Sequence, residues 1–347
     1  MSGERPSLRE PALHSFQVEE EDSGRLDVLV SIRLDISRNQ AATLIAEGNV
    51  LVNGKRERAS YKPSSGESID VTIPPPPGRD LLAEEIPLDV VFEDDHLMVI
   101  NKPAGMVVHP APGNWSGTLV NALLGRGGPL AATADEDRAG LVHRLDKETS
   151  GLLIVARSDR AHRILGKALS ERRVVRRYAT MLWGHLREDR VTIDAPIDRA
   201  PRDRKRMAIV SSGRPAHTDL VRLARFDSVD FVRAHLHTGR THQIRVHAAS
   251  IGHPVVGDDT YGGGGGRRLL RLPPRRHFLH AAWLRFRHPI TGSEMDVRAP
   301  LPPDLLQALA AAAGDATYAE HPDPLDFLGF FNDPLASGEA SSPDSGV

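Results

Sequence analysis

The chain has 347 residues, 40% of them hydrophobic and 26% charged, with 44 Lys and Arg against 46 Asp and Glu, which is typical of a globular protein of two domains with tails. It has no cysteine, so disulfides, thiolate catalysis and cysteine-ligated metal centres are excluded. No basic segment followed by an apolar one opens the chain, and no apolar run approaches the ~20 residues of a membrane span, so we expect a cytoplasmic protein without membrane contact.

The first predicted elements form a small N-terminal domain. Residues 1–22 are acidic, polar and aperiodic, which predicts disorder. Residues 23–76 then form an independent unit, in which Ser37 to Gln40 has the form of a capping box followed by apolar residues at helical spacing. A β-rich run at 50–52 leads into Asn53-Gly54, which is a strong hairpin signal.

A run of four prolines, Pro74 to Pro77, predicts a linker to a second unit at 86–310. Short strand-like runs recur in this unit, and the one convincing helix between them is capped by Ser158. The pattern predicts an α+β domain with a mixed, largely antiparallel sheet flanked by helices. Residues 315–347 predict a flexible acidic tail, in which apolar residues near 325–331 could dock locally. The expected strands are Val90–Phe92, Leu97–Ile100, Leu152–Ala156, Tyr178–Trp183, Asp219–Leu223, Phe231–His237 and Phe278–Phe286.

Basic residues are concentrated in the second unit. Residues 138–182 carry 11 Lys and Arg against 4 Asp and Glu, and residues 198–245 carry 11 against 5. Such a region suits a polyanion, because phosphate contacts supply much of the affinity for nucleic acids. Charged residues on ordinary solvent-exposed faces would give the same pattern. Charge alone therefore does not distinguish a surface that binds nucleic acid from one that is only solvated.

The densest chemical motif is the polar run from His143 to Ser150, which lies between two apolar stretches. Catalytic groups concentrate on loops of this kind when a rigid scaffold supports them. Asp146 lies between Arg144 and Lys147, and cationic neighbours that point toward it would keep its carboxyl ionised. An ordinary turn with an N-capping aspartate is the alternative.

A second run, from Leu236 to His247, packs two arginines, three histidines and a glutamine behind a strand. His242 and His247 suggest a metal, but their five-residue spacing does not place both on one helical face, and the run has no acidic ligand. We therefore predict no metal here. Contacts to phosphate, or an ion pair with a buried aspartate, fit these residue types better.

Two further runs bear on the shape of the site and on cofactors. The run from Asn101 to Pro110 leaves a strand and turns, which fits the floor of a site and a plain hairpin equally well. The run Gly262–Gly266 lacks the Lys-Ser/Thr of a P-loop and the spacing of a dinucleotide fingerprint. It therefore predicts a flexible loop and no nucleotide cofactor.

Together these runs resemble the RluA family of pseudouridine synthases, and within it the RluD type that acts on large-subunit ribosomal RNA. The run His143–Gly151 is similar to the catalytic loop of the family, and Thr238–His247 is similar to its later signature. Residues 23–75 look like an S4 RNA-binding domain. Shorter matches are Asn101-Lys102-Pro103, His109-Pro110, Val255–Asp258 and Tyr261-Gly262.

The resemblance implies a cofactor-free isomerisation of uridine to pseudouridine, with 23S ribosomal RNA or a large-subunit precursor as the expected partner. The N1–C1′ bond breaks, the uracil turns in place, and C5 joins C1′. Asp146 corresponds to the essential aspartate, which acts either as a nucleophile at the sugar or as a base at C2′. Tyr178 corresponds to the tyrosine that stacks on the uracil, and Arg245 to the basic residue that pairs with the aspartate.

The resemblance also implies roles in substrate binding. Arg144 corresponds to an arginine that fills the space of the flipped base, where a planar guanidinium replaces part of the lost stacking. His143 and Thr149 are expected beside the substrate, and the enzyme is expected to be a monomer. The residues expected to contact RNA are Arg25, Arg38, Lys55, Arg240 and His242.

Two other classes of protein remain open from the residues alone. A non-catalytic RNA-binding or ribosome-assembly protein would account for the S4-like unit and the basic centre, and would tolerate Asp146→Asn. An enzyme that hydrolyses RNA or nucleosides would need a metal cluster or a second positioned carboxylate, for which Glu148 is the nearby candidate.

Overall fold

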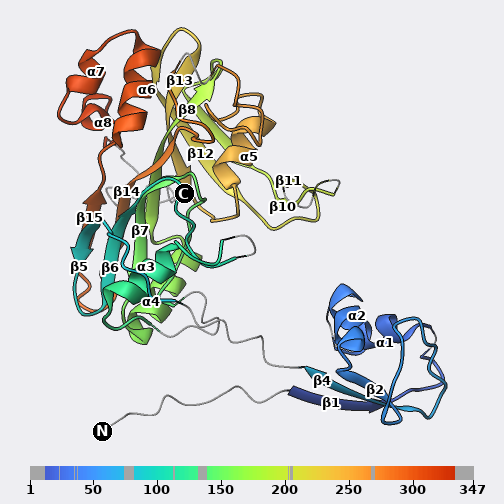
Figure 1. Cartoon of the computed structure of the whole chain (residues 1–347). Helices are drawn as coiled ribbons and strands as arrows, with labels where there is room; N and C mark the ends of the chain where they lie inside the picture. The colour runs from blue at the N-terminus through green and yellow to red at the C-terminus, as the bar shows by residue number, and fades with distance from the viewer. Residues whose placement is uncertain are drawn as a thin grey trace, which may run out of the picture. The chain divides into compact units, whose positions relative to one another are not determined.

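The computed structural model describes residues 12–22, 24–34, 36, 38–73, 82–111, 114–131, 139–201, 203, 206–266 and 270–332. The chain divides into two compact units, Met1–Asp80 and Leu81–Val347 (Figure 1). Within the described ranges, no helix combines the length and apolar character needed to cross a membrane.

The first unit packs two helices on a four-stranded antiparallel sheet with the strand order β1-β4-β2-β3. Its core is aliphatic, and Leu26, Val30 and Ile69 are fully buried. Asn53 and Gly54 both have positive φ, 49° and 76°, as a tight β-hairpin turn requires, so the predicted hairpin is confirmed. The elements are β1 (Ala12–Gln17), α1 (Leu26–Arg33), α2 (Arg38–Ala46), β2 (Val50–Val52), β3 (Lys55–Arg56) and β4 (Ser68–Ile73).

The prediction of disorder for residues 1–22 is wrong for its second half. Ala12–Gln17 forms β1 and pairs with β4 in continuous antiparallel register, with Phe16 opposite Ile69. Without β1, the outer edge of β4 would carry unpaired backbone N–H and C=O groups. β1 pairs with these groups, although its own sequence mixes polar and apolar residues. Residues 1–11 and the predicted helix cap Ser37 lie outside the described residues.

The second unit is built on a nine-stranded sheet with the order β5-β6-β7-β14-β8-β13-β12-β9, and β15 also pairs with β14. Among the strands of the described residues, only β7 and β14 pair in parallel, so the predicted mixed, largely antiparallel sheet is confirmed. Five of the seven predicted strand runs lie within its strands, and the runs Phe231–His237 and Phe278–Phe286 each extend one residue beyond theirs. The strands are β5 (Val90–Glu93), β6 (Leu97–Lys102), β7 (Ser150–Ala156), β8 (Val175–Trp183), β9 (Arg190–Asp194), β12 (His217–Arg225), β13 (Val229–Leu236), β14 (Leu279–Arg287) and β15 (Glu294–Arg298), and a separate ribbon consists of β10 (Ile197–Arg199) and β11 (Met207–Ile209).

Helices cover both faces of this sheet (Figure 1). Successive residues of a strand point to opposite faces, so Tyr178 lies in one core with residues of α3 and α5, whereas Ala179 lies in another with residues of α6 and α8. The hydroxyl of Ser158 accepts the Ala161 N–H at 3.3 Å, which confirms the predicted cap of α4. The helices are α3 (Leu119–Arg126), α4 (Asp159–Ser170), α5 (Gln243–Ser250), α6 (Pro303–Ala313), α7 (Thr317–Glu320) and α8 (Pro324–Phe327).

Two segments predicted to be loose are packed instead. Leu325 and Phe330 are fully buried against α6, so the prediction of a flexible tail at 315–347 is wrong for 315–332, because its apolar residues outweigh its acidic composition. Residues 333–347 lie outside the described residues. In the glycine run, the Gly263 carbonyl accepts the indole N–H of Trp183 at 2.8 Å, so Gly262–Gly266 folds into turns on the domain surface rather than a free loop.

Candidate active site

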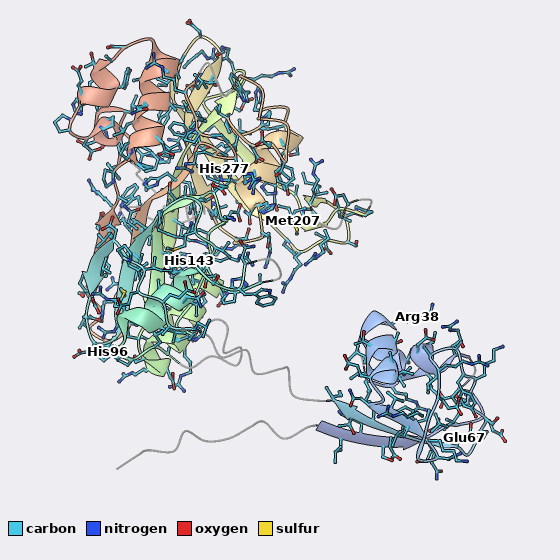
Figure 2. All side chains as sticks on the ribbon, viewed as in Figure 1. Arg38, Glu67, His96, His143, Met207 and His277 are labelled. Atoms are coloured by element: carbon cyan, nitrogen blue, oxygen red, sulfur yellow. The ribbon has the colours of Figure 1, made fainter. Side chains whose placement is uncertain are left out.

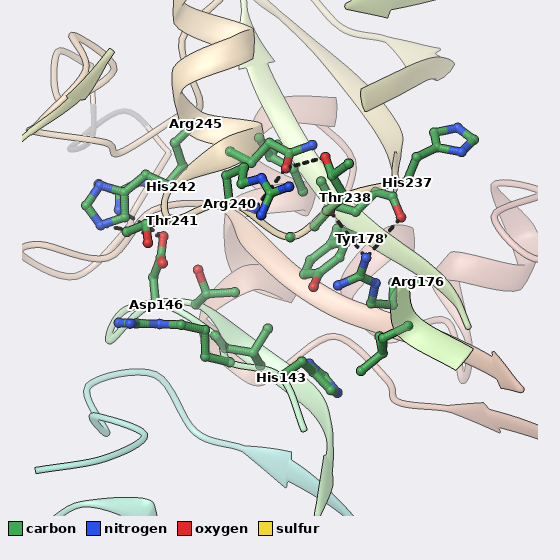
Figure 3. A pocket seen from close by; sticks show the side chains of 18 of the residues that line it. His143, Asp146, Arg176, Tyr178, His237, Thr238, Arg240, Thr241, His242 and Arg245 are labelled. Carbon is green, nitrogen blue, oxygen red and sulfur yellow. Dashed lines mark hydrogen bonds and ion pairs between the residues drawn. The ribbon is translucent and has the colours of Figure 1, made fainter. Parts of the chain in front are cut away.

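A cavity of about 550 Å³ opens on the face of the large sheet that carries Tyr178 and Leu236 (Figure 3). Its size lies within the roughly 300–1,000 Å³ of small-molecule sites. Its walls come from the loop 141–149, from β8 and from the segment between β13 and α5. Among the described residues that line it, Asp146 is the only carboxylate. Five arginines also line it, namely Arg144, Arg172, Arg176, Arg240 and Arg245.

Asp146 lies in the loop before β7, at the edge of this cavity, and its side chain is 16% exposed. Arg245 Nη1 donates to Asp146 Oδ2 at 3.0 Å, and Nε2 of His242 lies 3.9 Å from the same oxygen. The Asp146 carbonyl accepts the Thr149 N–H at 3.1 Å, which closes the loop as a turn. The carboxylate is thus oriented from one side and open to the cavity on the other.

Arg245 is itself fixed by a second carboxylate. Its Nε donates to Asp258 Oδ2 at 2.7 Å and its Nη2 to Asp258 Oδ1 at 2.9 Å, which is the strong, planar two-point geometry of guanidinium and carboxylate. Asp258 is 1% exposed and also accepts the backbone N–H groups of Thr260 and Tyr261. The Arg245 guanidinium therefore bonds both Asp258 and Asp146 and fixes the two carboxylates relative to each other.

The protonation states of Asp146, Arg245 and His242 depend on one another. Burial raises the pKa of the Asp146 carboxyl, but His242 and Arg245 beside it outweigh burial and hold that pKa below its usual value. Burial lowers the pKa of Arg245, but the carboxylates of Asp258 and Asp146 prevail and raise it. Burial lowers the pKa of His242, which favours a neutral imidazole at neutral pH. The site therefore holds an ionised carboxylate against a permanent cation.

The turn into α5 places Arg245 by means of a strained residue. His242 adopts the left-handed conformation, with φ 57° and ψ 21°, which costs a non-glycine residue about 1–2 kcal/mol. Its Nδ1 lies 2.8 Å from the Tyr261 hydroxyl, which fixes the ring. The side-chain oxygen of Gln243 accepts the Arg240 N–H at 2.9 Å and the Thr238 hydroxyl at 2.8 Å, so the amide holds the whole turn in shape.

A buried lysine supports the backbone of the Asp146 loop from behind. Lys102 is completely buried, and its Nζ donates to the carbonyls of Pro103 at 2.7 Å, Met106 at 2.9 Å and Lys147 at 3.2 Å. Burial lowers the pKa of Lys102 to about 7, yet three carbonyl acceptors match the three donors of an ammonium group. We therefore describe Lys102 as a protonated bridge between two loops.

Arg276 holds the other end of the same loop. It is 3% exposed, and it donates to the Glu148 carbonyl, to Ser150 Oγ at 2.7 Å and to Asp304 on α6 at 2.8 Å. The loop then enters β7 at Gly151, where φ is +112° and a Cβ would collide with the backbone of Ala281. A glycine is therefore required where β14 pairs with β7.

The residues predicted to touch the substrate divide into two pairs. Tyr178 lines the cavity near Asp146 (Figure 3), and burial raises the pKa of its phenol. Arg144 also lines the cavity and is exposed. His143 accepts the Ile154 N–H on Nε2 at 3.0 Å, and burial lowers its pKa to about 3. The Thr149 hydroxyl lies 2.9 Å from Nε2 of buried His277. These contacts anchor the loop, and His143 and Thr149 also line the cavity.

The five predicted RNA contacts belong to both units. Arg240 and His242 line the cavity of the second unit. Arg25 and Arg38 of the first unit bond the same buried carboxylate, Asp27, at 2.9 Å and 3.0 Å, while their own side chains are 43% and 57% exposed. Figure 2 marks Arg38 on this unit. Lys55 is exposed on β3, beside the hairpin turn.

Several groups of the site carry no local signal in the sequence. Asp258 and Tyr261 lie in a stretch that fits the resemblance but has no chemical pattern of its own, and Lys102 belongs to the run that fits equally a plain hairpin. Arg176 and Arg276 each lie among other arginines. Glu148, the second carboxylate that a hydrolase would need, is not among the described residues that line the cavity.

Comparisons with known proteins give the family of the chain. The model of the RNA pseudouridylate synthase family matches residues 96–250, and the model of the S4 domain matches residues 24–69. An RNA pseudouridine synthase of Bacillus subtilis is 43% identical over 298 residues, which cover 84% of this chain and 95% of that protein. The chain belongs to the RNA pseudouridylate synthase family.

Other relatives of this RNA pseudouridylate synthase include an enzyme named for its substrate. Ribosomal large subunit pseudouridine synthase D of Escherichia coli is 40% identical over 320 residues, covering 88% of this chain and 94% of that protein. The solved structure of human RNA pseudouridylate synthase domain containing 1 is 33% identical with a TM-score of 0.52, covering 65% of this chain and 89% of that one. The predicted family and its isomerase class are confirmed, as is the S4 domain.

Proposed function

We propose that this synthase converts uridine to pseudouridine in the RNA of the large ribosomal subunit, with Asp146 as the catalytic carboxylate. The observation that carries the proposal is the single carboxylate in a cavity of five arginines, held at 3.0 Å by Arg245. The substrate follows from the Escherichia coli relative, whose name gives the large ribosomal subunit and which aligns with 88% of this chain.

The reaction needs one carboxylate because nothing is added to the product. The N1–C1′ bond breaks, C5 bonds to C1′, the C5 proton leaves and N1 gains a proton, so uridine and pseudouridine are isomers. Asp146 acts either by bonding C1′ of the ribose or by removing the C2′ proton, and an ionised carboxylate serves both routes. Arg245 keeps it ionised and fixes its open oxygen toward the cavity.

The neighbouring side chains suit a flipped base. Tyr178 lines the cavity on β8, where its ring offers a stacking surface for a uracil beside Asp146. Arg144 lies at the cavity edge, from which its planar guanidinium can replace the flipped base in the RNA stack. Arg172 and Arg240 line the same cavity and are suited to the flanking phosphates.

The S4 domain supplies a second RNA contact. Arg25, Arg38 and Lys55 are exposed on it, and pairing with Asp27 fixes the two arginines without removing them from solvent. We place the enzyme in the cytoplasm, where ribosomal RNA is modified. We assign it as a monomer because one chain supplies every residue that the proposed reaction uses.

The test is release of tritium from RNA labelled at C5 of uridine. Asp146→Asn keeps the shape of the side chain and should abolish release, while RNA affinity stays within about threefold because phosphate contacts dominate binding. Glu148→Gln is the matched control, since this carboxylate of the same loop does not line the cavity. Full activity in Asp146→Asn would refute the assignment, and inactivity in Glu148→Gln would point to a second catalytic carboxylate.

A further inference from the structure

A second cluster of histidines and aspartate lies on the opposite face of the large sheet. In the antiparallel pair of β12 and β13, Asp219 is opposite His235 and Thr218 is opposite Leu236. The next pair brings His237 opposite His217, whose carbonyl accepts the His237 N–H at 3.2 Å. Leu236 points into the cavity, and alternation along the strand directs the side chain of His237 to the other face. His237 still borders the cavity at its rim, but its ring points away from Asp146 (Figure 3).

Three of these side chains direct ligand atoms at one point. Nε2 of His237 lies 2.6 Å from Asp219 Oδ2, and Nε2 of His217 lies 3.4 Å from Asp219 Oδ1. All three ligand atoms fit within 4.8 Å of one another. A zinc ion with ligands at about 2.0–2.1 Å in tetrahedral geometry separates them by about 3.4 Å. The observed spacing therefore requires only small side-chain rotations around an ion.

The groups behind these ligands are also those of a metal site. Nδ1 of His217, the nitrogen that faces away from Asp219, lies 3.5 Å from Asp194 Oδ2. A carboxylate in this position orients a metal-bound imidazole and increases its basicity. The hydroxyl of Thr192 donates to Asp219 Oδ1 at 2.8 Å, as ligating carboxylates are commonly held.

Solvent exposure and the neighbouring charges indicate that three residues serve as ligands. The side chains of His217, Asp219 and His237 are each about a quarter exposed, at 27%, 24% and 24%, so an ion can reach them from solvent. The His235 ring lies against that of His237, with centroids 3.9 Å apart and planes tilted by 45°, and its Nδ1 lies 3.8 Å from Asp219 Oδ2. It is paired across the sheet with Arg177, whose cation disfavours a bound metal beside it. The fourth position is therefore left to water.

We propose that His217, Asp219 and His237 bind a divalent transition-metal ion of the zinc class. Two imidazoles and a carboxylate form a ligand set that zinc accepts, and the chain has no cysteine to compete for it. The ion clamps β12 to the end of β13, one residue before Thr238, where the segment that leads to Arg245 begins. The sequence predicted no metal because it places these ligands 20 residues apart in two strands and shows only the unrelated pair His242 and His247.

The test uses the untagged full chain after treatment with EDTA. Titration calorimetry with Zn²⁺ should show about one ion per chain, and bound Zn²⁺ should raise the melting temperature, since an ion that binds the folded state stabilises it. Co²⁺ should give the visible absorption of a tetrahedral site. The double variant His217→Gln/His237→Gln should lose affinity for Zn²⁺ by at least about tenfold. His14→Gln is the matched control, because this exposed histidine lies in the other unit.

Two results would overturn the proposal. One is the absence of Zn²⁺ binding by the wild-type chain, and the other is unchanged stoichiometry and affinity in the double variant, which would move the site elsewhere. Circular dichroism establishes whether the double variant is folded. If it is not, Asp219→Asn decides, because it keeps the shape and the Thr192 hydrogen bond but removes the charge, and unchanged affinity in it contradicts the site.

Discussion

At the scale of single residues, Arg245 is the group on which the proposed site depends. Its guanidinium is 8% exposed and bridges Asp146 and Asp258, so removing it leaves two buried carboxylates without their cation. Breaking one partner of a buried pair costs about 3–5 kcal/mol. The position is therefore expected to affect both the charge of Asp146 and the stability of the domain.

Replacement of Arg245 tests this expectation. Arg245→Met should lower the free energy of unfolding by about 3–5 kcal/mol in urea denaturation and should abolish turnover, because the pKa of Asp146 rises and its orientation is lost. Arg173→Met is the control, since this arginine is 54% exposed in its pair with Glu171 and should change stability by no more than about 1 kcal/mol. Equal decreases in stability in the two variants would contradict the bridging role.

The shifted pKa values of Asp146, His242 and Tyr178 predict that none of these three groups titrates between about pH 7 and about pH 9. The pKa of Asp146 lies below 3.8, that of His242 below 6.5 and that of Tyr178 above 10.0, so all three keep one protonation state from about pH 7 to about pH 9. Turnover of saturating RNA should therefore not change with pH in this window through these groups. An inflection that disappears in His242→Asn or Tyr178→Phe would show that one of them titrates there.

At the scale of elements, the loop that carries Asp146 is shaped by side chains beneath it. Lys102 joins it to the turn at Pro103–Met106, and Arg276 joins it to α6. The Lys147 carbonyl also accepts the Gly105 N–H at 2.9 Å, so Lys102 adds a second donor to it, and Arg276 supplies a donor to the Glu148 carbonyl. The position of the proposed catalytic carboxylate therefore depends on β6, which carries Lys102, and on the segment before β14, which carries Arg276.

Lys102 is the sharper test of this arrangement. Lys102→Met fills the same space but removes the donor from the Pro103 and Met106 carbonyls, at about 1–3 kcal/mol for each that water cannot reach, while the Lys147 carbonyl keeps the Gly105 N–H. We expect kcat to fall more than KM rises, because the loop moves while the RNA contacts remain. Lys167→Met, at a lysine 70% exposed on α4, should leave both constants unchanged. A change in KM alone would assign Lys102 to RNA binding instead.

Periodic elements could be predicted from the sequence, whereas those defined by their partners could not. The apolar stripe and cap of α4 are local features, and the structure has them at the predicted place. Strands β13 and β14 lie where strands were predicted, but nearly all of their residues are buried, on both faces. Helix α5 was missed because all residues from Gln243 to Ala248 are buried, which removes the contrast between faces. Strand β1 was missed because its partner β4 determines it.

The site shows the same limit. Asp146 stands out locally as a polar loop residue between cations, but the hydrogen bond from Arg245 spans 99 positions, and only the family resemblance predicted it. No sequence pattern pointed to Asp258, although it is the carboxylate that fixes Arg245. Long-range ion pairs follow from the topology that brings β7 and α5 together, and spacing along the chain does not contain that information.

At the scale of the whole molecule, the two units divide recognition and chemistry. The proposed catalytic residues all lie in the second unit, after Leu81, whereas Arg25, Arg38 and Lys55 lie in the first. RNA affinity that depends on both units should decrease with salt more steeply than affinity that depends on one, because each phosphate contact releases counterions.

Deletion of Met1–Asp80 tests this division. The remaining chain should bind RNA more weakly and with a shallower dependence on salt, while turnover at saturating RNA is retained. In the full chain, Arg25→Gln/Arg38→Gln should reduce the slope of log affinity against log salt by up to about 0.7–0.9 for each phosphate that these arginines no longer neutralise. An unchanged affinity and slope after deletion would show that the S4 domain does not contact this RNA.

The most direct measurement of the central claim is a pseudouridine map of large-subunit ribosomal RNA from cells that lack this gene. Specific pseudouridines should be missing, a plasmid copy of the wild-type chain should restore them, and a copy with Asp146→Asn, produced to the same level, should not. A map identical with and without the gene, or restored by the Asp146→Asn copy, would contradict the account.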